Sequence, residues 1–190
     1  ELNLADKEAP VPISYYPTPG FAIYSTPVTP GKARCTYRTS LGTSYVVIGP
    51  SVYFVAANSA LVFVGSIPDR ASQVYMADNG LAVVIVDGSS SGWAINMVTN
   101  AFAAIIDPSF YGADFVVLLD TFFVFNRPDT NQFYISLSLV DYALLTAGTS
   151  FDALDIAAKA GSADPIVGIT TTHKELWLIG ELTTDVWYGT

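Results

Sequence analysis

The chain has 190 residues, of which 51% are hydrophobic and only 13% are charged, about half of the usual charged share. This composition excludes intrinsic disorder, which requires low hydrophobicity and high charge. The net charge of −9, from 17 acidic and 8 basic side chains, argues against tight nucleic-acid binding, because such binding depends on Lys and Arg that neutralise phosphates.

The first 32 residues differ in kind from the rest of the chain. Prolines at positions 10, 12, 17 and 19 stand among Ser and Tyr, and proline removes a backbone donor and favours extended conformations. We therefore expect an extended, Pro-rich segment over residues 1–32. The chain does not begin with Met, shows no signal peptide and stops directly after a strand-like run, so we expect a piece of a longer protein.

From residue 33 onward, apolar runs rich in Val, Ile, Phe and Tyr alternate with turn residues, which is typical of β-hairpins. Asn79-Gly80 is the strongest of the turn signals. The segment 151–160 fits a short helix or an irregular outer strand equally well. The strands expected from these signals are 34–38, 44–48, 52–55, 61–64, 74–77, 81–86, 93–96, 102–106, 115–119, 122–125, 133–137, 166–170, 176–179 and 185–188.

The hairpins form a repeating unit, a central hairpin followed by one or two outer strands. Central turns near residues 49, 87, 120 and 173 are separated by 38, 33 and 53 residues, an irregular version of the ~40–50 residues of a propeller blade. In runs such as Val83–Val86 both alternating faces are apolar, so each sheet should be covered on both sides. We expect an all-β fold with a β-propeller-like domain over residues 33–190, made of about four antiparallel blades and truncated at its C-terminal end, with a β-sandwich as the alternative.

A membrane span deserves consideration because residues 39–68 contain no charged side chain. The run is interrupted by Gly42, Gly49-Pro50, Asn58 and Gly65, which mark turns, and its other residues favour strands. We expect a deeply buried sheet and no membrane span.

Catalytic motifs are missing from the sequence. There is no Gly-rich phosphate loop, no nucleophile elbow and no Cys–His pair of useful spacing. Cys35 and His173 are each the only residue of their type, so neither a disulfide nor a thiolate or His-rich metal site is expected. We expect His173 to be a structural residue, buried or in a turn, and we expect no enzyme, no cofactor and no metal.

Paired carboxylates are the strongest enzymatic candidates, because glycosidases use two carboxyl groups about 5–10 Å apart. The pairs in question are Asp152 with Asp155, Asp107 with Asp114, and Asp155 with Asp164. The competing interpretation, which we favour, is that aspartates at strand ends accept hydrogen bonds from nearby backbone N–H groups in turns. Asp78, Asp87, Asp107 and Asp120 all stand at expected turns.

Aromatic and basic residues supply two further candidates. Trp93, Trp177, Trp187 and the pair Tyr15-Tyr16 could form a carbohydrate platform, although packing between blades explains large aromatic side chains better. The basic cluster Lys32, Arg34 and Arg38 is interpreted as a solvated strand or loop face.

Four stretches of the sequence are distinctive. They are Tyr16-Pro17-Thr18-Pro19-Gly20, Asp107-Pro108-Ser109-Phe110-Tyr111-Gly112, Phe151-Asp152-Ala153-Leu154-Asp155, and His173-Lys174-Glu175-Leu176-Trp177 followed by Gly180-Glu181-Leu182-Thr183-Thr184-Asp185-Val186-Trp187. Together they resemble a known family, the packaged DNA stabilisation proteins (tail hub or tail accessory factors) of short-tailed phages. Members of the family are considerably longer. The resemblance therefore implies that further blades are missing and that an open edge remains, which can close by pairing with another copy.

The resemblance implies a structural role in the virion, assembled in the cytoplasm of the bacterial host from a phage or prophage gene. The implied partners are the portal or an adaptor, the tail needle or fibres, and further copies of the chain, with DNA met only in passage. It implies no catalytic residue. The alternative function is a carbohydrate-binding or carbohydrate-cleaving propeller in host-surface recognition, and a third is a general protein-interaction propeller.

Overall fold

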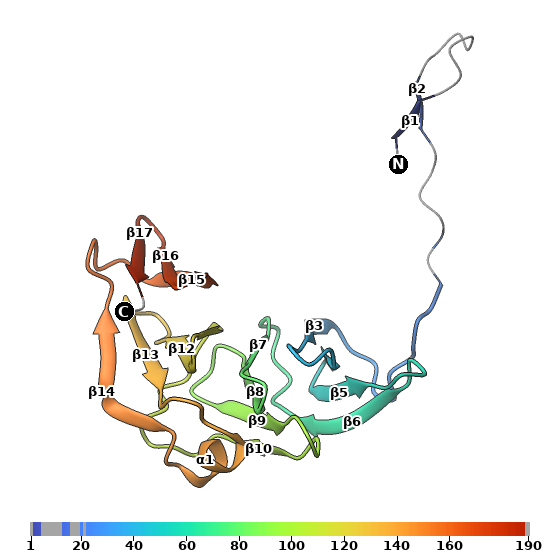
Figure 1. Cartoon of the computed structure of the whole chain (residues 1–190). Coiled ribbons are helices and arrows are strands. Elements are labelled where there is room, and N and C mark those ends of the chain that lie inside the picture. Colours follow the sequence, from blue (N-terminus) through green and yellow to red (C-terminus); the bar gives the residue numbers. More distant parts are fainter. Residues whose placement is uncertain (1, 5–12, 16–19, 21, 189–190) are drawn as a thin grey trace.

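The chain is built of antiparallel β-sheets that follow one another as propeller blades (Figure 1). This structure is a computed structural model that describes residues 2–4, 13–15, 20 and 22–188. Its strands and helix are β1 (Leu2–Leu4), β2 (Ile13–Tyr15), β3 (Ala33–Arg38), β4 (Ser44–Ile48), β5 (Ser51–Val55), β6 (Leu61–Ser66), β7 (Tyr75–Asp78), β8 (Ala82–Val86), β9 (Gly92–Asn96), β10 (Phe102–Ala104), β11 (Val116–Leu119), β12 (Phe122–Asn126), β13 (Gln132–Ser136), α1 (Tyr142–Ala147), β14 (Phe151–Ala158), β15 (Ile166–Thr172), β16 (Glu175–Gly180) and β17 (Thr184–Tyr188).

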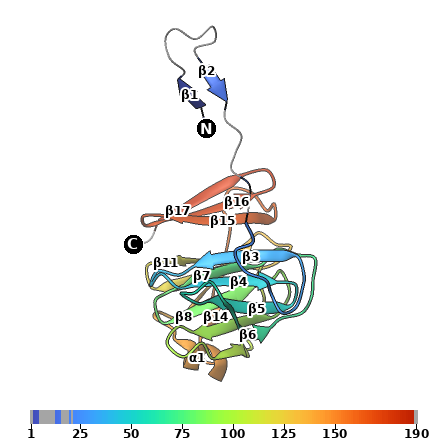
Figure 2. The same cartoon turned by 90° about the vertical axis from the view of Figure 1, so that its right-hand side faces the viewer.

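Four blades make up the main body, and each is a meander in which every strand pairs with the next one along the chain. Blade 1 is β3–β6, blade 2 is β7–β10, blade 3 is β11–β14 and blade 4 is β15–β17. Figure 2 faces blade 1 and shows β3, β4, β5 and β6 in this order across the sheet. The expected all-β fold of about four antiparallel propeller blades is thus confirmed, and the β-sandwich is not adopted.

The second strand of each blade explains why the hairpins are apolar on both faces. In β8 every residue from Ala82 to Val86 is fully buried. Val83 and Ile85 join the core between blades 1 and 2, whereas Val84 and Val86 join the core between blades 2 and 3. Side chains alternate across a strand, so a sheet that lies between two others must be apolar at every position.

The sequence predicted every strand of the four blades except β14, and the structure confirms them with ends displaced by at most two residues. The sequence analysis predicted a blade spacing that is more irregular than the spacing in the structure. The first strands begin at residues 33, 75, 116 and 166, which gives intervals of 42, 41 and 50. The earlier spacing mixed turns that are not equivalent, since residues 49 and 87 follow second strands whereas 120 and 173 follow first strands.

The longer third interval contains a helix that the sequence analysis missed. Asp141 caps α1 by accepting a hydrogen bond from the Leu144 N–H (2.9 Å), and Gly148 ends the helix with a φ of 77°. Leu145 is its buried anchor. The ambiguous segment 151–160 is resolved as the outer strand β14. Among the described residues no helix has the length and apolarity to cross a membrane.

The N-terminal 32 residues were expected to be extended. Within the described part of this segment, β1 pairs antiparallel with β2, a small sheet that the sequence did not predict. Residues 16–19, which hold most of the Tyr-Pro-Thr-Pro-Gly stretch, lie outside the described residues.

The blades follow an arc whose two ends are separate (Figure 1). β3 packs beside β7, β7 beside β11, and β11 beside β15. Within the described part of the chain, no contact of similar extent returns from blade 4 to blade 1. Blades 1 and 4 therefore each keep one sheet face without a neighbouring blade.

Candidate functional surfaces

Two of the stretches that carry the family resemblance meet at the junction of blades 2 and 3. Asp107 lies in the linker between these blades, and its Oδ2 accepts hydrogen bonds from the backbone N–H groups of Ser150 (2.7 Å) and Phe151 (3.0 Å). Its Oδ1 accepts from the Ser109 N–H (2.9 Å), as the turn-capping interpretation predicts. The carboxylate is 6% exposed and fully used in joining the linker to β14.

An aromatic cluster fills the space beneath this contact. Phe110 from the linker meets Phe125, Tyr134 and Phe151 at ring-centroid distances of 5.6, 6.1 and 5.5 Å. Tyr134 stacks on Phe125 at 5.1 Å, and its hydroxyl donates to the Gly112 carbonyl (2.8 Å). Sequence reasoning missed this convergence, because nothing local signals a contact between segments about 40 residues apart.

A second polar junction joins blade 3 to blade 4. Lys159 is 3% exposed. Its Nζ donates to Asp164 Oδ1 (2.6 Å) and to the carbonyl (2.8 Å) and Oγ1 (2.7 Å) of Thr183. Asp164 also accepts from the N–H groups of Leu182 (2.8 Å) and Thr183 (3.2 Å). A Cβ at position 180 would overlap both Lys159 and Asp164, which explains the glycine there. The Gly180–Thr183 part of the fourth stretch therefore encloses this buried ion pair.

We expect this junction to make the protein sensitive to acid. The hydrogen bond from Lys159, with those from Leu182 and Thr183, holds the pKa of the Asp164 carboxyl well below its usual value of 3.8. A carboxyl with a lowered folded-state pKa stabilises the protein above the unfolded-state pKa and loses this contribution as the pH falls below it. The melting temperature should therefore fall less between about pH 6 and about pH 3 in Asp164→Asn than in the wild type.

Asp155→Asn is the control for the acid experiment, because Asp155 is an exposed residue of β14. This variant should keep the acid loss of the wild type, as measured by circular dichroism during heating. An equal acid loss in Asp164→Asn and the wild type would contradict the assignment.

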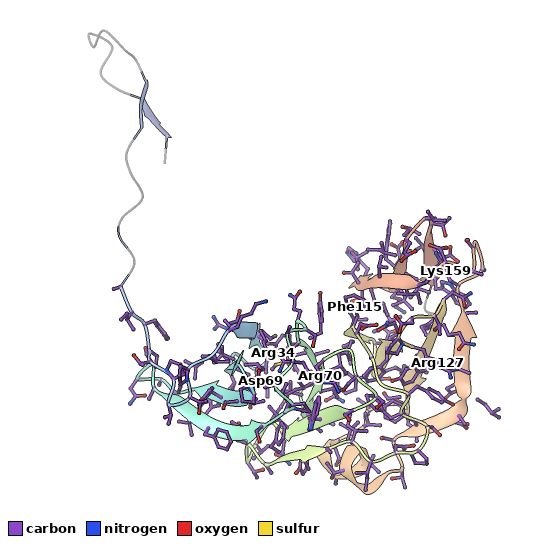
Figure 3. The ribbon with its side chains drawn as sticks, turned by 180° about the vertical axis from the view of Figure 1, so that it is seen from behind. Arg34, Asp69, Arg70, Phe115, Arg127 and Lys159 are labelled. Carbon is purple, nitrogen blue, oxygen red and sulfur yellow. The ribbon has the colours of Figure 1, made fainter. Side chains whose placement is uncertain are left out.

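A third junction overturns the interpretation of the basic cluster. Arg34 is 4% exposed and donates to the carbonyls of Ser72 (2.9 Å), Gly49 (3.2 Å) and Pro68 (2.9 Å). Its Nη2 lies 3.6 Å from Asp87 Oδ2 in blade 2. Arg34 therefore connects blades 1 and 2 and is not part of a solvated face, whereas Lys32 and Arg38 are exposed. Figure 3 shows Arg34 near Asp69 and Arg70, and Lys159 farther along the arc beside blade 4.

Two of the remaining carboxylate candidates, Asp114 and Asp152, are bonded to different groups of the scaffold. Asp114 accepts from the Asn126 side chain (2.7 Å), and Asp152 accepts from the Leu154 N–H (2.9 Å). Asp152 and Asp155 lie in an exposed irregularity of β14, where Tyr134 pairs with Ile156 but Ser136 pairs with Phe151. Each pair considered above thus has at least one carboxylate bonded to the scaffold.

The three tryptophans lie on different faces of the blades. Trp93 is buried in the core between blades 1 and 2. Trp187 packs on Phe133 of blade 3 at 5.1 Å, and it helps to line an apolar groove of about 300 Å³. Trp177 lies on the opposite face of blade 4, as its register with Val186 shows. Tyr16 lies outside the described residues, and the described tryptophans form no common platform.

The two single reactive residues have ordinary structural positions. His173 occupies the exposed turn between β15 and β16 with a φ of 53°, which agrees with a turn position. Burial raises the pKa of the Cys35 thiol to about 11, so the thiol stays protonated at neutral pH. Among the described residues, no three His, Cys, Asp or Glu side chains are grouped to hold a metal ion.

Comparison with protein families shows which family the chain belongs to. Residues 14–190 match the phage stabilisation family, described as bacteriophage P22 Gp10, beta-propeller. The chain belongs to this family. It is therefore a phage structural protein of the virion, a class whose members work in contact with other virion components. No curated protein matches the chain by sequence.

Solved structures similar to this member of the phage stabilisation family show the same blade architecture at low sequence identity. The designed Ika4 protein has a TM-score of 0.58 and 8% identity, and the match covers 89% of this chain and 99% of that one. The designed Ika8 protein has a TM-score of 0.55 and 9% identity over 82% of this chain. The Neurospora crassa Pan2 WD40 domain has a TM-score of 0.52 and 12% identity, also over 82%. The chain spans only 45% of Ika8 and 48% of the Pan2 domain.

Proposed function

We propose that this protein is a tail-hub component that joins the portal, or an adaptor below it, to the tail needle or fibres and retains packaged DNA. Membership of the phage stabilisation family carries the proposal. The three polar junctions support it, because they are buried and tie each blade to the next. Buried hydrogen-bonded networks rigidify a fold, which suits a part that must hold its shape against the pressure of packaged DNA.

The proposed role is non-enzymatic, and DNA is met in passage. The net charge of −9 opposes adhesion of duplex phosphates to the surface, so that DNA can move past the protein. We place the protein in the virion tail, after assembly in the cytoplasm of the host bacterium and in more than one copy.

Phage particles that lack the protein test this role. We expect such particles to package DNA and then lose it, so that the DNase-resistant DNA per capsid falls severalfold. Addition of the purified chain should restore retention and place the chain at the portal end, as seen by immunogold labelling.

The control for the particle experiment is Leu154→Ala. Leu154 is 86% exposed on β14, and its loss leaves the blade junctions intact, so this variant should restore retention as well as the wild type does. Full DNA retention in particles without the protein, or absence of the protein from purified tails, would contradict the proposal.

A further inference from the structure

Four large apolar side chains are exposed at one end of the strands of blades 2 and 3. Leu81 lies in the turn between β7 and β8, and its carbonyl accepts from the Met97 N–H (3.2 Å) in the turn between β9 and β10. Val98 belongs to that second turn, whereas Leu139 and Leu144 belong to the segment that follows β13. The four side chains are 47%, 89%, 56% and 40% exposed in chain order. We call these four residues the apolar patch.

The segments that carry the apolar patch are bonded to one another across the junction of the two blades. The Asn79 Nδ2, two residues before Leu81, donates to the carbonyl of Val140 (2.7 Å). The N–H of the preceding residue, Leu139, donates to the Thr121 carbonyl (2.9 Å) between β11 and β12. The helix α1 packs against β9 of blade 2 (Figure 1). Blades 2 and 3 each have a neighbouring blade on both sides, so the patch does not owe its exposure to a missing blade.

Leu139 is held in a backbone conformation that its side chain disfavours. Its φ of 53° lies in the left-handed region, which glycine adopts freely and in which a bulky residue is an outlier. The side chain is more than half exposed, so burial within the described chain does not offset this strain. Strained residues of this kind cluster at sites that hold a ligand or partner. A partner that covers Leu139 supplies the burial that the chain itself does not.

The charge around the apolar patch is negative. Asp120, next to the β11–β12 turn, and Asp141, which caps α1, are both exposed. Residues 71–158, which span blades 2 and 3, contain nine aspartates and a single basic residue, at the far end of β12 from Asp120. At the same end of the strands, Arg38 belongs to blade 1 and Lys174 to blade 4. A basic partner surface therefore complements the patch, whereas DNA or a second copy of the patch is repelled.

We propose that the apolar patch is a docking surface for another virion protein, whose contact surface is apolar at its centre and carries Lys or Arg at its rim. The apolar centre of the partner covers Leu139, and its basic side chains face Asp120 and Asp141. The inference rests on the proposed tail-hub role and adds to it the surface and the chemistry of one contact.

Binding of the purified chain to DNA-filled particles that lack the protein, measured by cosedimentation, tests the proposal. Leu139→Asp places a charge in the patch and should weaken binding on the order of 100-fold. Leu139→Gly is the sharper variant, because it removes the apolar contact and also relieves the left-handed strain. It should melt at no lower temperature than the wild type and yet bind roughly 10-fold more weakly. A residue that only supports the fold cannot produce this combination.

Asp120→Asn tests the charge of the partner. Asp120 has a φ of 52°, which Asn tolerates as well as Asp does, so this variant removes the charge alone. It should bind more weakly than the wild type at low salt and equally at high salt, where charges are screened. A photoreactive benzoylphenylalanine in place of Val98, which is 89% exposed, identifies the partner. Its cross-links should lead to another virion protein.

Val28→Asp is the matched control, because Val28 is 87% exposed in the segment before blade 1. This variant should bind as the wild type does. Normal binding of Leu139→Gly would overturn the docking surface, as would cross-links to DNA or to a second copy of the chain. If that variant also restores DNA retention, the tail-hub role stands without this surface. If particles without the protein keep their DNA although the chain binds them through the patch, the tail-hub role fails and the docking surface stands.

Discussion

Replacement of Phe125 by alanine is expected to lower the free energy of unfolding by about 3–5 kcal/mol, the range for large aromatic residues in well-packed cores. Phe125 is fully buried, and its ring contacts Phe110, Tyr134 and Phe151 at centroid distances of 5.1 to 5.6 Å. These rings come from the linker, β13 and β14. A small movement of one strand or one loop therefore cannot fill the cavity that the Phe125 ring would leave. Urea denaturation measures the loss.

Two further variants separate packing from other causes. Phe125→Leu keeps most of the side-chain volume and should cost only about 1–2 kcal/mol. Leu154→Ala, at an 86% exposed position, should change stability by less than about 0.5 kcal/mol. A loss below about 1.5 kcal/mol for Phe125→Ala would show that this cluster does not hold blades 2 and 3 together.

The hairpins could be predicted from the sequence because their signals are local. Asn79-Gly80 is an example, since the Asn79 side chain accepts from the N–H groups of Leu81 and Ala82 (both 3.0 Å) and Gly80 has a φ of 81°. The strand β8 is apolar on both faces, and this predicted the blade architecture for an equally simple reason. Only a sheet that lies between two other sheets needs apolar residues on both of its faces. The helix α1 was missed because six residues are too few for a clear helical period.

The contacts between blades could not be predicted, because they join residues that are far apart in the chain. The sequence predicted that Arg34 belongs to an exposed basic cluster. In the structure it donates hydrogen bonds to the carbonyl groups of residues 49, 68 and 72, which only the folded linker brings together. Asp107 and Phe151 carry two of the stretches that resemble the phage family, and nothing in either stretch indicates the other. The resemblance indicated the family correctly, but only the structure shows what these residues do.

The linker between blades 2 and 3 should also depend strongly on Gly112, and we expect Gly112→Ala to be more destabilising than Gly80→Ala. The two glycines have nearly the same left-handed conformation, with φ of 79° and 81°. An added Cβ at Gly80 meets nothing within 4 Å, whereas at Gly112 it overlaps the backbone of Ser89 and Ser90 in the turn before β9. The Gly80 variant therefore isolates the cost of the backbone conformation, about 1–2 kcal/mol.

Gly112→Ala should add roughly 1–3 kcal/mol to that cost, since backbone atoms cannot rotate away from the new methyl group as a side chain can. The Gly112 carbonyl also accepts the Tyr134 hydroxyl (2.8 Å), so a shift of the linker disturbs the aromatic cluster as well. Urea denaturation of the two variants side by side measures the difference. Equal losses would mean that the linker can move away from Ser89 and Ser90 at little cost. The close approach of the blade 2–3 linker to the turn before β9 would then not be needed to position blade 3.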